Sequence, residues 1–437
     1  MGKPGRRPKT VDSPGHRISF HNSLESPESL LLSQASPPDN SELQAIASKF
    51  DAVVLSTADP YLRALPTSEK NLINLLFDKD FFIQHFVFGP SFASGMQSKL
   101  HVHFITWPTI LRESFLACSA GFVRAHGKAL ESSEMELSLG ATALQRLRTM
   151  TVNRPAEVAL VLSLGTALLT FELLTSSKHS HAIGQHTLSL LRPWYDSVAL
   201  SPEMDMDVLC PLFLDTAHCL LKREVPVIRY HVRDTSIVDR YVGLSSTLLP
   251  FLYDVCILGH RSKHTVLPSN SELDEGLESN FLDLEEIIQA WRPSPPVAFA
   301  HLFSNHEIIL LLTHARVYQE AALLILHRLR YPFGSGDREA RLRSQNIFSE
   351  FEMCFSVTGQ YAVSAALPFL VASLEVTDIG QRQEILCRVV AGKGELFHHV
   401  ARRQQRFLED VWLRRDQGKE FSWFDLVDGI QEFDILL

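Results

Sequence analysis

Histidines are the only residues in this sequence whose clustering suggests chemistry. Three of the 19 histidines, His179, His181 and His186, gather at a short polar break between two apolar segments. A metal site needs side chains that converge, usually with carboxylates or thiols nearby, and these spacings lack the HExxH pattern that puts two histidines on one helix face. The same holds for the other close pairs, which are His101 with His103 and His398 with His399. We expect surface or capping histidines, and keep His179, His181 and His186 as the one candidate functional cluster.

Known catalytic signatures are missing from the sequence. There is no GxSxG nucleophile elbow, no GxGxxG loop and no Walker lysine motif, and Gly334-Ser335-Gly336 and Gly392-Lys393-Gly394 are typical of turns. Asp205 and Asp207 do not form the aspartate-rich DDxxD metal motif of helical terpene cyclases. We therefore expect no catalytic residue, no cofactor and no metal ligand set, and enzymatic activity is the less favoured interpretation.

Composition narrows the classes of protein. The chain has 437 residues, 45% of them hydrophobic, and a formal net charge of −9, so the protein as a whole has no electrostatic attraction to nucleic acid. Its 6 cysteines stand singly in apolar segments with no CxxC pair, which indicates reduced thiols of an intracellular protein. The first residues, MGKPGRRPKTVDSPG, contain no apolar stretch of a secretory signal.

Residues 1–38 differ from the rest of the chain. They are rich in proline, serine and charge and lack a periodic apolar pattern, which predicts a disordered basic tail. The run KPGRRPK (3–9) is compatible with nuclear import or with a weak DNA contact, and equally with a solvated tail. Order is predicted to begin at Asp39, which can cap a helix that has Glu42 three residues later.

Helix-period apolar spacing dominates residues 39–437 and predicts an all-α fold, a large multi-helix domain of packed antiparallel helices. The segment 156–194 predicts its structural centre, a helical pair that breaks at Thr175–Lys178. Val158–Leu174 contains Ser163 and Glu172, so we expect a buried core helix here and no membrane span. The other predicted helices cover 39–50, 71–88, 108–127, 130–150, 202–221, 238–258, 277–291, 297–330, 340–357, 360–376, 382–391 and 395–415, with a last turn or two after 422. Asp378 and Arg382 have the spacing of an ion pair that stabilises a helix start.

Four segments resemble, in the same order, segments of one known family. They are ALVLSLGTALLTFELLTSSKHSHAIGQHTLSLL (159–191), AALLILHRLRYPFGSGD (321–337), LPFLVASLEVTDIGQR (367–382) and VWLRRDQGKEFSWFDLV (411–427). Gln185, Leu367 and Ser373 depart from the family pattern, which has Ala, Trp and Gly there. The matching residues are Glu172, Leu173, His181 and Gly184 in the first segment, Leu326, His327 and Arg328 in the second, Pro368, Phe369, Ala372, Glu375 and Arg382 in the third, and Val411, Trp412, Arg415, Asp416 and Trp423 in the fourth.

The family is that of fungal zinc-binuclear-cluster transcription factors, and the resemblance is to the second common type of their regulatory domain. It implies a nuclear transcriptional regulator of a metabolic or secondary-metabolite pathway, with the transcription machinery or other regulators as partners and a small-molecule effector as an open alternative. The six-cysteine zinc cluster that such factors carry before this domain has no counterpart in the sequence, which has no cysteine before Cys118. DNA contact is then expected at most weakly, through the tail 1–38. The alternative is an isomerising or pericyclic enzyme, or a small-molecule binder, that reuses the helical fold, since such a catalyst needs only a shaped apolar cavity.

Overall fold

The computed structural model describes residues 60–127, 133–175, 178–198, 202–232, 238–264, 271–393, 396–418 and 420–430. The predicted tail 1–38 and the helix predicted from Asp39 lie outside these ranges. Within them the chain is helical, and the only β-type contacts are two isolated bridges, Asp239 with Gly243 and Phe333 with Phe421. The predicted all-α multi-helix fold is confirmed.

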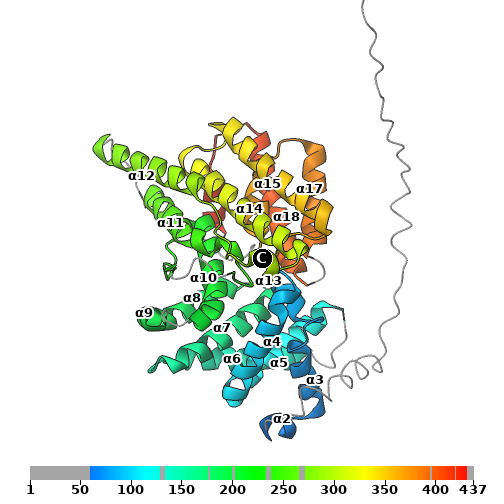
Figure 1. The fold of residues 1–437 in the computed structure, drawn as a ribbon. Coiled ribbons are helices and arrows are strands. Elements are labelled where there is room, and N and C mark those ends of the chain that lie inside the picture. Colours follow the sequence, from blue (N-terminus) through cyan, green and yellow to red (C-terminus); the bar gives the residue numbers. More distant parts are fainter. Residues whose placement is uncertain are drawn as a thin grey trace, which may run out of the picture.

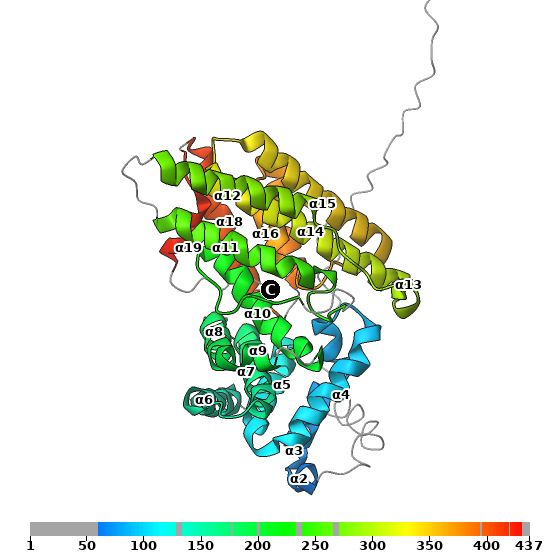
Figure 2. The same cartoon turned by 60° about the vertical axis from the view of Figure 1, so that its left-hand side comes forward.

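The first half of the described chain packs around α5 and α7, each of which contacts α6 and the other. These helices occupy the lower half of both views (Figure 1 and Figure 2). The elements are α2 (Pro60–Ala64), α3 (Thr67–Leu76), η3 (Ile83–Phe86), α4 (Pro90–Thr106), α5 (Pro108–Ala125), α6 (Ser133–Thr149), α7 (Ala156–Thr175), α8 (Ser180–Leu191), η4 (Arg192–Trp194) and α9 (Tyr195–Val198).

The second half packs around α14, which contacts α11, α12, α15 and α16. The connection between the halves is α10, since this one helix touches α7 and α8 on one side and α11 and α19 on the other. The elements are α10 (Pro202–Lys222), η5 (Leu244–Leu248), α11 (Leu249–His264), α12 (Ser271–Ala290), α13 (Phe299–Leu302), α14 (Asn305–Arg330), α15 (Asp337–Thr358), α16 (Ala366–Leu374), α17 (Ile379–Lys393), α18 (His398–Asp416) and α19 (Trp423–Gly429).

The predicted central pair is α7 and α8, which pack against each other directly. They pack tightly at Gly165 of α7, where an added Cβ would overlap the side chain of Thr187 on α8. By length and composition α7 and α14 could each cross a membrane, but 67% of the apolar window of each is buried inside the protein. Helix α7 is apolar on most of its faces because it is buried on most of them.

Two predicted helices are wrong in extent because side chains cap the backbone inside them. The helix predicted over 71–88 ends at Leu76, since Asp78 Oδ1 accepts the backbone N–H groups of Asp80 and Phe81 at 2.8 and 3.0 Å. The helix predicted over 297–330 is divided into α13 and α14, because Ser304 and Glu307 form a reciprocal capping box that starts α14.

Two further differences concern the segments before α5 and before α11. The stretch 238–243 is not helical, since Asp239 closes a turn and Gly243 has a φ of +57°. Helix α4 has no counterpart among the predicted helices, because serine, glycine and polar residues dilute its apolar spacing. It nevertheless forms, with Pro90 in its first turn, where a missing N–H costs nothing.

A buried ion network joins α14, α16 and α18. Arg328 donates to both carboxylate oxygens of Glu375, at 2.7 and 2.5 Å, and also to Asp337 at 2.9 Å. Arg415 of α18 lies 3.7 Å from Glu375, and the guanidinium groups of Arg328 and Arg415 lie 4.6 and 4.5 Å from the Phe333 ring. The positive charges of the two arginines are thus matched by the negative charges of Glu375 and Asp337. The network holds the turn 331–337 against the three helices.

The predicted pair of Asp378 with Arg382 is wrong. Arg382 instead reaches across to α18, where its guanidinium contacts both oxygens of Asp416 at 2.6 and 2.8 Å. Asp378 does support the start of α17, but through its own Oδ1, which accepts the backbone N–H of Gln381 at 2.8 Å. A bidentate bond to a planar guanidinium is stronger than an exposed contact between neighbouring turns, which explains the choice of partner.

Glu307 ties the two halves together. Its carboxylate accepts the N–H and the hydroxyl of Ser91 in α4, both at 2.8 Å, in addition to the N–H and hydroxyl of Ser304, both at 2.9 Å. Gly89 leaves the room for this approach, because a Cβ there would lie 2.5 Å from Glu307 Oε1. Burial acts to raise the pKa of Glu307, but these bonds lower it below its ordinary value.

Glu307→Gln is expected to lower the free energy of unfolding by about 1–2 kcal/mol near neutral pH. Because the pKa of Glu307 is depressed in the folded protein, its contribution is complete above the unfolded value, about 4.3, and is lost as the pH falls through the folded value. The difference between wild type and variant should therefore shrink on acidification, which urea titrations at several pH values measure. Glu409→Gln, at an exposed position, is the control. A difference that does not change with pH would contradict this role.

Candidate functional site

The three histidines of the candidate cluster do not converge. His179 is exposed at the N-cap of α8 and makes no side-chain capping bond. His186 Nε2 lies 3.3 Å from the backbone oxygen of Leu147 in α6. Only His181 turns toward α10, where its Nε2 lies 3.2 Å from Asp215 Oδ1. One of the three is thus part of a polar cluster, and the prediction that they act as a group has no geometric support.

The pair His101 and His103 also separates. The ring of His101 packs edge-on against Phe77, with centroids 5.4 Å apart. His103 faces α7, where its Nδ1 lies 2.5 Å from Ser163 Oγ. It thereby reaches the wall of a cavity that the sequence did not reveal.

This cavity, called the Arg240 cavity after one of its lining residues, has a volume of about 90 Å³ and lies among α3, α4, α5, α7 and α10. Its wall is mostly apolar and includes Phe82, Phe86, Phe115 and Leu162. Buried apolar cavities of about 150 Å³ bind a molecule of the size of benzene. At about 90 Å³ the enclosed space is smaller than that. It suits a short chain or part of a ring, and its open side allows the rest of a molecule to extend outward.

One end of the Arg240 cavity is charged. Lys99 Nζ pairs with Asp207 Oδ2 at 2.9 Å, and His103 Nε2 lies 3.8 Å from the same oxygen. Burial lowers the pKa of His103 below its ordinary value, with Asp207 opposing and Lys99 and Arg240 adding to the decrease. This shift favours the neutral form of His103. Lys99 pairs with Asp207, and Arg240 is the other cationic side chain in the lining.

One nitrogen of Arg240, in the lining of this cavity, lacks a hydrogen-bond partner among the described residues. Its Nη1 is buried and has no hydrogen-bond partner in the described part of the chain. The turn that carries it is held firmly, because Asp239 Oδ1 accepts the N–H groups of Tyr241 and Val242 at 2.7 and 2.8 Å. A buried N–H without an acceptor is costly, which points to an acceptor supplied from outside the chain.

Ser163, His103 and Asp207 look like a catalytic triad but lack its geometry. The Ser163 hydroxyl lies 2.8 Å from the backbone oxygen of Ala159, one turn back in α7, which binds its hydrogen. Asp207 lies 3.8 Å from the imidazole, beyond hydrogen-bond distance. Ser163 also stands in the middle of a helix, where backbone N–H groups are already bonded and cannot form an oxyanion hole. The arrangement is suited to binding.

Comparison with known proteins gives one match. The family model described as a fungal specific transcription factor domain matches residues 101–437. No curated protein and no solved structure matches the chain. The match starts inside α4, so α3 and η3, which supply part of the cavity wall, precede it. Sequence reasoning missed the cavity because its residues come from segments more than 150 positions apart. His103, Ser163 and Asp207 had been noticed, but for other reasons and not as one group.

Proposed function

Because the chain belongs to the fungal specific transcription factor domain family, and regulation of transcription is therefore its general role, we propose that its helical domain is a receptor for a small amphipathic effector. The effector carries an apolar body and a carboxylate or similar acceptor group. Binding adjusts the activity of the regulator toward genes of a metabolic pathway in the nucleus, through contacts with the transcription machinery or with other regulators.

The observation that carries this proposal is Arg240 Nη1, a buried and unpartnered donor at the charged end of an otherwise apolar cavity. A guanidinium in this position binds a carboxylate through a charge-assisted bond, while the aromatic wall takes up the apolar part. The cavity touches α10, and α10 also contacts α11 and α19 of the second half. A ligand that repacks the Asp207 face of α10 can thus influence both halves.

A catalyst of small-molecule isomerisation in the same cavity is the second candidate. The observation in its favour is the 2.5 Å contact of Ser163 Oγ with His103 Nδ1. It holds in the cavity wall an imidazole, a group that can take up and release a proton. Incubating the protein with unsaturated or isomerisable small acids tests it. Turnover that disappears in His103→Gln would establish the enzyme, and binding without turnover supports the receptor.

Small acids are expected to bind wild-type protein and to raise its melting temperature, whereas Arg240→Gln should weaken their affinity about tenfold or more. The probes are benzoate, phenylacetate and hexanoate, with phenylacetamide as the neutral counterpart, measured by calorimetry. Arg229→Gln is the matched control, because Arg229 is exposed and pairs with Asp254 at 2.8 Å, away from the cavity.

A second variant tests the contribution of the cavity volume separately from that of the Arg240 charge. Ala167→Leu extends a side chain from the apolar wall into the cavity and should abolish binding of acids and amide alike. Fused to a heterologous DNA-binding domain, wild-type protein should change reporter output when an acid that binds is added, and Arg240→Gln should not. Equal affinity of wild type and Arg240→Gln for every acid, or no binding of any probe, would sink the proposal.

A further inference from the structure

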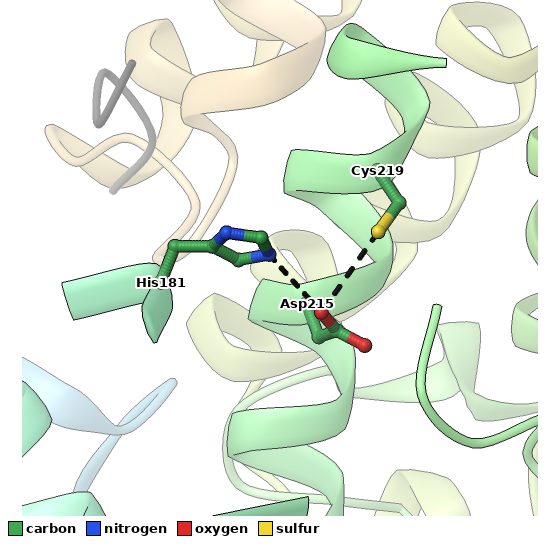
Figure 3. A group of neighbouring side chains, drawn as sticks. All are labelled: His181, Asp215 and Cys219. Carbon is green, nitrogen blue, oxygen red and sulfur yellow. Dashed lines mark hydrogen bonds and ion pairs between the residues drawn. The ribbon is translucent and has the colours of Figure 1, made fainter. Parts of the chain in front are cut away.

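His181, Asp215 and Cys219 bring an imidazole, a carboxylate and a thiol together where α8 meets α10 (Figure 3). Asp215 and Cys219 are four residues apart and share one face of α10, and His181 reaches them from the start of α8. Asp215 Oδ1 lies 3.2 Å from His181 Nε2 and 3.8 Å from Cys219 Sγ. One donor atom of each residue lies within 4.8 Å of the others.

These separations are close to those around a zinc ion. With bond lengths of about 2.0 Å to nitrogen and oxygen and about 2.3 Å to sulfur, tetrahedral coordination puts nitrogen and oxygen about 3.3 Å apart and sulfur and oxygen about 3.5 Å apart. The observed values of 3.2 and 3.8 Å differ from these by a few tenths of an ångström. The imidazole nitrogen and Cys219 Sγ lie within 4.8 Å of each other, against about 3.5 Å around zinc, so rotation of the two side chains must bring this pair closer. We propose that His181, Asp215 and Cys219 bind Zn²⁺.

The fourth coordination position has room for a water molecule. A small cavity of about 20 Å³ adjoins the cluster and is lined by His181, Asp215 and His218, among others. A single water needs about 10–15 Å³ of such space. Three protein ligands with one exchangeable water is the pattern of open zinc sites, whereas purely structural sites usually have four protein ligands.

The surroundings hold the ligands in place. Asp215 Oδ2 accepts the backbone N–H of Val227 at 2.8 Å, which leaves Oδ1 facing His181 and Cys219. The ring of His218 stacks on that of His181, with centroids 3.4 Å apart and planes 13° apart. Such outer contacts orient metal ligands and strengthen binding. Burial and the neighbouring Asp215 raise the pKa of the Cys219 thiol, and a divalent cation reverses that preference.

Zinc at this position would fasten the α7–α8 pair to α10, the helix that joins the two halves. The proposal is independent of the Arg240 cavity, because the two sites share no lining residue. It also goes against the expectation from sequence that no metal is bound, since neither Asp215 nor Cys219 lies near His181 in the chain.

The test uses full-length protein freed of metal by a chelator and then titrated with Zn²⁺ or Co²⁺. Wild type is expected to bind one equivalent, to melt at a higher temperature with Zn²⁺, and to show with Co²⁺ the intense absorption of tetrahedral cobalt bound to a thiolate. Cys219→Ser should lose the thiolate-to-cobalt band, and His181→Ala should weaken affinity by more than the 10- to 100-fold typical of losing an outer contact.

His179→Ala and Cys387→Ser are the matched controls, since both residues are exposed, and each should bind as wild type does. Circular dichroism of the metal-free variants shows whether they fold, and Asp215→Asn, which keeps the size of the side chain, replaces any variant that does not. Absence of stoichiometric binding to wild type would overturn the site. So would a cobalt spectrum that is unchanged in Cys219→Ser.

Discussion

Replacing Arg328 by alanine is expected to lower the free energy of unfolding by about 3–5 kcal/mol, the usual cost of breaking a buried ion pair by removing one partner. Arg328 and Glu375 are 3% and 1% exposed. Without the guanidinium, the Glu375 carboxylate stays buried with only Arg415, at 3.7 Å, to offset its charge. The backbone oxygens of Tyr331, Pro332 and Ser335 lose their donor as well.

Chemical denaturation followed by circular dichroism measures this loss. Arg316→Ala is the matched control, because Arg316 is on the same helix and pairs with Glu350 at the surface, where its side chain is 52% exposed. Exposed pairs contribute about 0–1 kcal/mol. If both alanine variants lose the same amount, the interior network does not stabilise the fold as its geometry indicates.

Gly165→Ala is expected to destabilise the protein by about 1–3 kcal/mol, although alanine is the better helix former by about 0.5–1 kcal/mol. The new Cβ would overlap Thr187 Oγ1 and lie 2.5 Å from Thr187 Cγ2 and 2.9 Å from its Cβ. Rotation of the threonine cannot relieve the last contact, so α7 and α8 must move apart.

Gly276→Ala provides the comparison, because this glycine is also inside a helix, α12, but has open space where the Cβ would be. It should gain stability by the helix-forming difference alone. In the double variant Gly165→Ala/Thr187→Ala two of the three close contacts disappear, so part of the lost stability should return. Similar effects of the two single glycine variants would contradict close helix packing at Gly165.

The residues that carry the family resemblance are largely those that hold the helices together. Arg328 and Glu375 form the buried pair, Arg382 binds Asp416, and Trp412 Nε1 donates to the backbone oxygen of Ser373 at 3.0 Å. They come from segments 321–337, 367–382 and 411–427, which meet in the second half of the fold. The resemblance in these segments therefore marks a shared scaffold.

His181 belongs to that resemblance and also to the proposed zinc cluster. Sequence reasoning grouped it with His179 and His186 because the three are neighbours in the chain. On a helix, residues two and five positions apart point in different directions, and the structure separates them accordingly. The partners of His181 are 34 and 38 positions later in the sequence, and no local pattern announces them.

The sequence by itself determined the helical class, most helix positions and the family, because apolar spacing, prolines, glycines and local motifs act over one or two turns. It also determined that α7 would be central and buried. Where side chains cap the backbone, as at Asp78 and Ser304, the helix ends were decided by hydrogen bonds that spacing alone does not reveal.

Only the tertiary structure decided which distant polar groups meet. Arg240, Lys99 and Asp207 meet at one end of the Arg240 cavity, and Asp215 and Cys219 face His181, because α10 packs against α7 and α8. This packing sets the separations of the side chains. Those depend on side-chain volumes throughout the core, such as the absence of a side chain at Gly165. The candidate sites of this protein are therefore formed by helix packing, and they could not be located from the sequence before the positions of the helices were known.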